Sequence, residues 1–67
     1  MGEELENRLR EERARRGLTQ AQLAELVGVS RKTINTVENG VFVPSTVLSL
    51  RLAMALGTTV EKLFSLR

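Results

Sequence analysis

The sequence predicts an all-α domain of five short helices, and three observations support this class. Four glycines each follow a segment with helical periodicity, and glycine takes the left-handed conformation of a helix C-cap without steric cost. Serine or threonine, the preferred N-cap residues, stands where four of the helices should begin. No segment alternates apolar and polar residues as a half-buried strand does. The glycines are Gly17, Gly28, Gly40 and Gly57.

The first helix is expected over residues 4–16. Leu5, Leu9 and Arg13 recur every four residues and therefore share one helical face. Arg13 then lies on the apolar side of this helix, where an unpaired charge would be costly. We expect Glu38, beside the buried side of the third helix, to pair with it.

The second and third helices are expected over residues 20–26 and 31–39. Thr19 and the glutamine three residues later have the spacing of a capping box, and Ser30 is the expected N-cap of the third helix. The link at residues 27–29 is too short for antiparallel packing. The two helices should therefore cross at a steep angle.

The fourth helix is expected over residues 46–56, after the N-cap Ser45, and the fifth over residues 59–65. Thr58 and Thr59 are equally good N-caps for the last helix. A chain of 67 residues has room for one small core, so a single domain over its whole length is expected.

Composition excludes several function classes. The chain has no cysteine and no histidine, and therefore lacks thiol chemistry, the commonest general base and the commonest zinc ligand. We expect neither an enzyme nor a bound metal, cofactor or small-molecule ligand. No secretory or membrane-spanning segment is expected, which favours a cytoplasmic protein. The net charge of +2 is too small to identify a nucleic-acid partner by itself.

The exposed face of the third helix is polar and carries little charge. Ile34 and Val37 define the buried side of this helix. The opposite side and its edges carry Arg31, Lys32, Asn35, Thr36 and Asn39. Such side chains can donate hydrogen bonds to base edges or contact a thymine methyl group. An ordinary solvated face is the alternative interpretation of this helix taken alone.

Residues 19–40 resemble the helix-turn-helix of the Cro and phage-repressor family, also called the xenobiotic-response-element type. The resemblance depends on the spacing of small Ala24, turn-forming Gly28, and β-branched Ile34 and Val37. It implies a lambda-repressor-like domain whose third helix lies in the DNA major groove.

The resemblance covers about residues 9–64 and places the helix-turn-helix proper at residues 20–39. It also implies an ion pair between Arg13 and Glu38 that orients the third helix. Together with the polar face, it leads us to expect base contacts from Arg31, Lys32, Thr33, Asn35 and Thr36. Phosphate contacts are expected from Arg10, Arg13, Gln20 and Asn39. Val41 departs from the family, because many relatives have a basic or polar residue there.

The fourth helix carries a second apolar stripe. Leu48 and Leu52 face the expected core, whereas Val47 and Met54 fall on the opposite side with Leu50 beside them. A second apolar stripe indicates a second packed surface. We expect a homodimer interface formed by Phe42, Val47, Leu50, Met54, Val60, Phe64 and Leu66. Scattered exposed side chains, or cover by the C-terminal segment of the same chain, are the alternatives.

The expected function is sequence-specific binding of double-stranded DNA. The simplest form is a homodimeric repressor that reads a palindromic operator with residues 31–39. The alternative is an antitoxin or co-regulator that uses the same module mainly for contacts with another protein.

Overall fold

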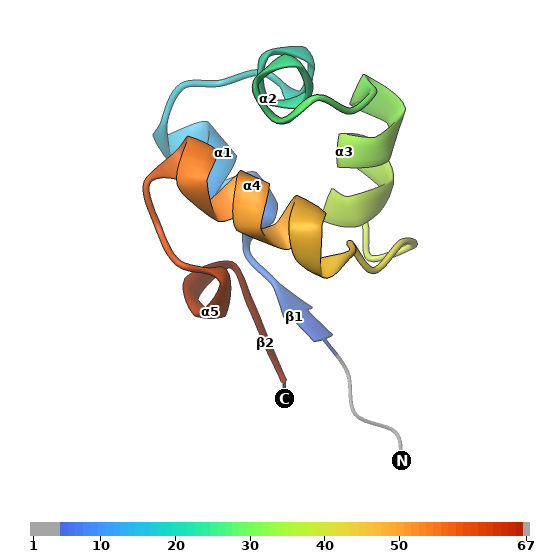
Figure 1. Ribbon diagram of the computed structural model, residues 1–67, viewed down its shortest axis with the longest axis vertical. Coiled ribbons are helices and arrows are strands. Elements are labelled where there is room, and N and C mark those ends of the chain that lie inside the picture. The colour runs from blue at the N-terminus through green and yellow to red at the C-terminus, as the bar shows by residue number, and fades with distance from the viewer. Residues whose placement is uncertain (1–4, 67) are drawn as a thin grey trace.

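The computed structural model describes residues 5–66, and this part of the chain contains five helices and one two-stranded ribbon (Figure 1). The elements are β1 (Leu5–Asn7), α1 (Leu9–Arg15), α2 (Gln20–Val27), α3 (Arg31–Glu38), α4 (Thr46–Leu56), α5 (Val60–Leu63) and β2 (Phe64–Leu66). The expected all-α class with a helix-turn-helix is confirmed, and the ribbon is a small addition to it.

Local capping contacts start α2 to α5 at residues that the sequence predicts, and one of the expected glycines ends α2. The N-caps of α2 to α5 are Thr19, Ser30, Ser45 and Thr59, and each accepts the backbone N–H three residues later. Gln22 completes the capping box at Thr19 by accepting the Thr19 N–H at 2.8 Å. Gly28 ends α2 with a φ of +78°, a conformation that other residues rarely adopt. The chain therefore turns sharply between α2 and α3.

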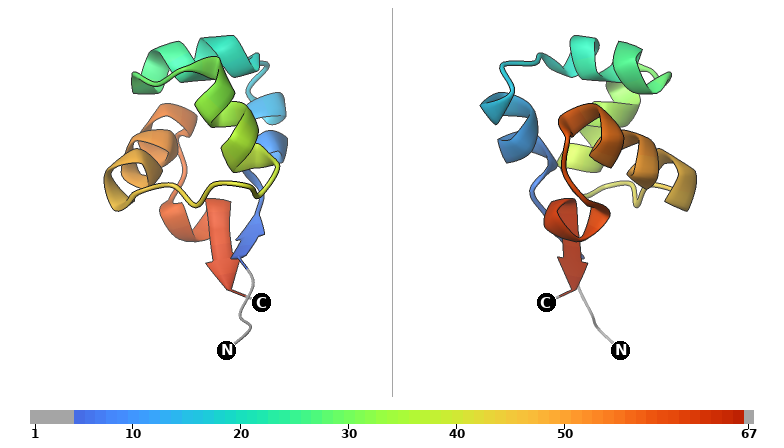
Figure 2. Two further views of the ribbon diagram at one scale, coloured as in Figure 1. Left: turned by 90° about the vertical axis from the view of Figure 1, so that its right-hand side faces the viewer. Right: turned by 60° about the vertical axis from the view of Figure 1, so that its left-hand side comes forward.

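The two ends of the described chain differ from the sequence-based expectation. The expected helix over residues 4–16 begins only at Leu9, and the one expected over 59–65 ends at Leu63. Residues 5–7 and 64–66 instead pair as antiparallel strands, with Leu5 opposite Leu66 (Figure 2). Such pairing between distant segments has no local sequence signal. The start expected at residue 4 lies outside the described residues.

The core lies between the helices, with α3 crossing α2 steeply and α4 lying beneath α2 (Figures 1 and 2). Its apolar members are Leu9, Leu23, Ala24, Val27, Ile34, Val37, Leu48, Leu52, Ala53, Leu56, Leu63 and Phe64. Phe64, expected in a dimer interface, is instead part of this core and only 8% exposed, so it has little surface to offer a second subunit. Strand β2 turns this side chain inward and leaves Leu66 exposed. None of the described helices has the length and apolar character needed to span a membrane.

Candidate nucleic-acid interface

The outward side of α3 presents hydrogen-bond donors. Arg31, Lys32 and Asn35 are exposed and together line one shallow hollow. Thr33 and Thr36 are half-buried, and the Thr36 hydroxyl donates to the Thr33 carbonyl at 2.9 Å. The two threonines line a different hollow, which they share with Lys32, so Lys32 connects the five residues expected to contact bases.

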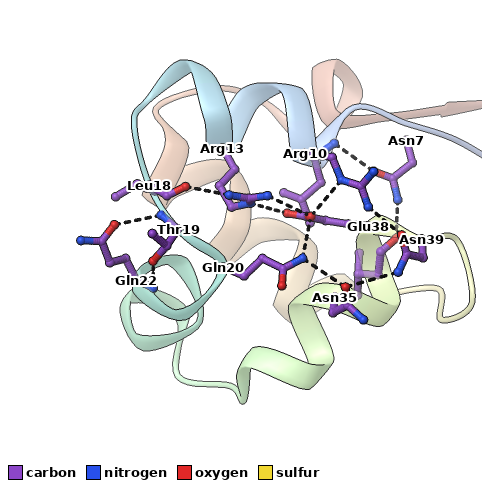
Figure 3. Close-up of polar contacts among 12 residues, drawn as sticks. Asn7, Arg10, Arg13, Leu18, Thr19, Gln20, Gln22, Asn35, Glu38 and Asn39 are labelled. Carbon is purple, nitrogen blue, oxygen red and sulfur yellow. Dashed lines mark hydrogen bonds and ion pairs between the residues drawn. The ribbon is translucent and has the colours of Figure 1, made fainter.

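Glu38, in the last turn of α3, joins three segments of the chain (Figure 3). Its Oε2 accepts from Arg13 Nε at 2.6 Å, and its Oε1 accepts from Arg13 Nη2 at 3.2 Å. Oε1 also accepts from Gln20 Nε2 at 3.0 Å and from Arg10 Nε at 3.4 Å. The side chain of Glu38 is 0% exposed. One buried carboxylate thus holds α3 against α1 and the start of α2.

Arg13 has an internal role in this structure. Besides its two bonds to Glu38, it donates from Nη1 to the Leu18 carbonyl at 2.7 Å, and its side chain is 15% exposed. These bonds use one N–H of each guanidinium nitrogen, so Arg13 has two N–H groups and little exposed surface left for the expected phosphate contact. The expected Arg13–Glu38 pair is present, although Leu5 lies in β1 and not on the same helix.

A second chain of contacts runs along the exposed edge of α3. Arg10, whose side chain is 58% exposed, donates from Nη2 to Asn39 Oδ1 at 2.6 Å. Asn39 donates to Asn35 Oδ1 at 3.3 Å, and Gln20 donates to the same oxygen at 3.2 Å. The structure therefore brings together Arg10, Gln20 and Asn39, three of the residues expected to contact phosphate.

Asn7, which the sequence pattern does not single out, also supports α3. Its Nδ2 donates to the Val37 carbonyl at 2.5 Å, and its Oδ1 accepts the Leu9 N–H at 2.9 Å. Asn7 thus links the start of α1 to the end of α3. An asparagine just before a helix is a capping signal, but the first helix was expected to begin before it.

The pKa of Glu38 lies below its ordinary value of 4.5. Burial alone raises this pKa, but the hydrogen bonds from Arg13 and Gln20, the charge of Arg13 and the hydrogen bond from Arg10 together outweigh that effect. The charged form of Glu38 therefore stabilises the folded state.

This lowered pKa predicts a pH dependence of stability. The contribution of Glu38 is present above about pH 4.5, the ordinary pKa, and is lost as the pH falls through the lower folded-state pKa. We expect the free energy of unfolding to exceed that of Glu38→Gln at pH 7, and the difference to shrink in acid. Urea denaturation of both proteins from pH 7 to pH 3 measures this. A difference that stays constant over the range would contradict the assignment.

The surface expected to form the homodimer interface divides into two parts. Leu50, Met54 and Val60 line one hollow of about 620 Å³ between α4 and α5. Phe42 lines other hollows, with residues of α3 and with Leu5 of β1. Among the apolar side chains of α4, Val47 is 59% exposed, Leu50 53% and Met54 82%. Three neighbouring apolar residues on one helix therefore remain more than half exposed in the described chain.

Comparison with known proteins finds a match to the helix-turn-helix family over residues 9–63. The chain is 40% identical over 60 residues to YgzD of Bacillus subtilis, an HTH-type transcriptional regulator, covering 90% of this chain and 91% of YgzD. It is 49% identical over 59 residues to an HTH-type transcriptional regulator of Methanothermobacter thermautotrophicus, covering 87% of this chain and 86% of that protein.

A solved structure agrees with these matches. The restriction-modification controller protein C.AhdI from Aeromonas hydrophila superposes with a TM-score of 0.78 at 42% identity. The superposition covers 82% of this chain and 83% of C.AhdI. The family match, the relatives and the geometry of α2 and α3 lead to one conclusion. The chain belongs to the helix-turn-helix family of Cro/C1-type DNA-binding transcriptional regulators.

Proposed function

We propose that residues 1–67 form one DNA-binding domain that acts as a homodimeric repressor of a palindromic operator. The observation that carries this proposal is the outward face of α3, which offers Arg31, Lys32 and Asn35 while the only carboxylate of α3, Glu38, is buried. A face with donors and no exposed acid suits the major groove, whose base edges are rich in acceptors. The Glu38 contacts fix this helix before DNA arrives, so binding requires little rearrangement.

The contacts divide into those that read bases and those that position the protein. We assign base contacts to Arg31, Lys32, Thr33, Asn35 and Thr36. We assign phosphate contacts to Arg10, Gln20 and Asn39. Arg10 is largely exposed, and Gln20 offers its backbone N–H, because it lies in the first turn of α2, where such groups favour an anion. Arg13 is left out because its side chain is only 15% exposed and each of its guanidinium nitrogens already donates one hydrogen bond within the protein.

The homodimer accounts for the uncovered side chains of α4. We place Val47, Leu50 and Met54 at the centre of a two-fold interface, with Phe42, Val60 and Leu66 at its edges. An isologous contact of this kind buries the same apolar patch on both subunits. It would set two copies of α3 about 34 Å apart, one turn of DNA, which suits a palindrome. The repressor role follows most simply, because a bound dimer would block access to a promoter.

Selection of bound sequences from random double-stranded DNA tests the proposal. We expect an enriched site with two-fold symmetry whose half-sites lie about one helical turn apart. Enrichment of an asymmetric site would contradict the dimer, and no enrichment at any salt concentration would contradict DNA reading by α3.

Lys32 provides a residue-level prediction. Lys32→Ala should change the base preference at one position of each half-site, because Lys32 is exposed on the face of α3 that we place in the groove. The cost at the preferred base should be about 1–3 kcal/mol of binding free energy. Competition binding with single-base variants of the selected site measures it. Lys62→Ala, at an exposed position of α5, is the matched control and should leave the preference unchanged. Equal weakening of all sequences would instead assign Lys32 to phosphate.

A second candidate function is favoured by one observation. Leu26 of α2 is 61% exposed and lines a hollow with Met54 and Arg51 of α4. Exposed apolar side chains beside a charge are typical of protein interaction sites. An antitoxin or co-regulator would bind its partner protein there. Purification from source cells that retains a second protein in fixed stoichiometry, lost in Leu26→Ser, would favour this role.

A further inference from the structure

The orientation of the Asn35 amide determines which base it can read. We propose that the contacts around Asn35 lock it as a hydrogen-bond donor, so that it reads the acceptor edge of guanine and does not read adenine. This inference rests on the proposed function, because it places α3 in the major groove. It adds a base identity to that proposal.

The first constraint on Asn35 comes from Glu38. A carboxylate only accepts hydrogen bonds, so the end of Gln20 that faces Glu38 Oε1 at 3.0 Å must be its NH2 group. The same nitrogen lies 3.2 Å from the side-chain oxygen of Asn35. With one N–H used by Glu38, Gln20 has a second N–H for Asn35. The negative charge of Glu38 thus fixes the Gln20 amide, which in turn holds the Asn35 oxygen.

The second constraint comes from Arg10. A guanidinium group only donates, so the atom of Asn39 that lies 2.6 Å from Arg10 Nη2 must be its oxygen. The nitrogen of Asn39 then faces Asn35 Oδ1 at 3.3 Å. A positive charge on α1 therefore fixes the Asn39 amide in the orientation that also donates to Asn35.

Both series of hydrogen bonds, from Glu38 through Gln20 and from Arg10 through Asn39, end on one oxygen atom. Asn35 Oδ1 accepts from Gln20 and from Asn39, which uses both of its lone pairs. Figure 3 shows the Asn35 nitrogen on the side away from these contacts. Within residues 5–66 no hydrogen bond involves this nitrogen. Asn35 can therefore offer two N–H donors to a ligand and no free acceptor.

This orientation changes the readout that asparagine usually performs. An asparagine reads adenine by donating to N7 and accepting from the N6 amino group. Because its oxygen is occupied, Asn35 cannot accept from N6. Guanine presents two acceptors, N7 and O6, in the major groove, and Arg31 and Lys32 beside Asn35 favour the same atoms.

The experiment begins with the site selected by the unaltered protein. Comparison with the site selected by Asn35→Ala identifies the base pair whose preference depends on Asn35. We expect guanine there, and 7-deazaguanine, which lacks the N7 acceptor, should weaken binding about tenfold. Adenine at this position, with binding lost when its N6 amino group is removed, would overturn the inference. Uniform weakening of all sequences by Asn35→Ala would overturn it too, since Asn35 would then contact phosphate.

Two further variants test the lock itself. Asn35→Asp keeps an oxygen for Gln20 and Asn39 but replaces the outward donor with an acceptor. It should reject guanine and favour cytosine, whose N4 group donates. Gln20→Leu removes the hydrogen bond from Gln20 to the Asn35 oxygen and frees one of its lone pairs. The preference for guanine over adenine should therefore fall about tenfold. An unchanged ratio in Gln20→Leu would overturn the lock.

Gln22→Leu is the matched control. It alters the other glutamine at the start of α2 and removes its bond to Thr19, but it has no contact with Asn35. It should lower stability while leaving the ratio of guanine to adenine binding unchanged. If no DNA is selected by the unaltered protein, the proposed function fails. If a site is selected but no position depends on Asn35, the proposed function stands and only the inference that Asn35 reads guanine as a donor fails.

Discussion

Replacement of Glu38 by glutamine is expected to lower the free energy of unfolding by about 3–5 kcal/mol. The loss should be this large because the Glu38 side chain is 0% exposed and Arg13, at 15%, would keep its charge without a counterion. The glutamine NH2 group would also meet donors of Arg13, Gln20 or Arg10 where an oxygen now accepts. Small domains are stable by only about 5–15 kcal/mol, so the variant should be close to unfolding.

Urea denaturation at pH 7, followed by far-ultraviolet circular dichroism, measures this loss. Glu25→Gln is the matched control, because Glu25 is exposed on α2. Its effect should stay within about 0.5 kcal/mol. Equal stability of the two variants would show that the Glu38 contacts do not hold α3 in place.

Replacement of Leu50 and Met54 by glutamate should convert the proposed dimer to a monomer and weaken operator binding about a hundredfold or more. Both side chains are more than half exposed, at 53% and 82%, so the charges should leave the fold of each subunit intact. In a dimer, they would bring four like charges together at the centre of the interface. A monomer contacts one half-site at a time and loses the advantage of linked binding.

Sedimentation equilibrium and titration of the selected operator measure the two effects. A control that exchanges the residues, Leu50→Met with Met54→Leu, keeps the surface apolar and should remain dimeric. A glutamate variant that still sediments as a dimer would remove α4 from the interface. A monomeric variant with unchanged operator affinity would separate dimerisation from DNA reading.

Much of the fold follows from short-range features of the sequence. The capping box at Thr19 and the N-caps at Ser30 and Ser45 begin helices where expected, and Gly28 forms the turn between α2 and α3. These features act over three or four residues, so a sequence contains all the atoms involved. The buried positions Ile34 and Val37 follow from helical periodicity in the same way.

The ends of the chain were predicted less well for a physical reason. Leu5 and Phe64 lie next to segments with helical periodicity, and nothing within a few residues favours a strand over one more turn. Leu5 lies opposite Leu66 and Phe64 opposite Asn7, so this pairing depends on contacts between opposite ends of the described chain. Phe64 was therefore expected on the surface, whereas β2 buries it.

The candidate nucleic-acid interface also combines features that the local sequence predicts with features that depend on contacts between distant residues. The sequence by itself determined which residues line the outward face of α3, because that face follows from the positions of Ile34 and Val37. Only the tertiary structure decided how Glu38 and Arg10 orient the amides around Asn35. The physical reason is that each amide is oriented by a charged or polar side chain from another helix. These side chains meet only when α1, α2 and α3 pack together.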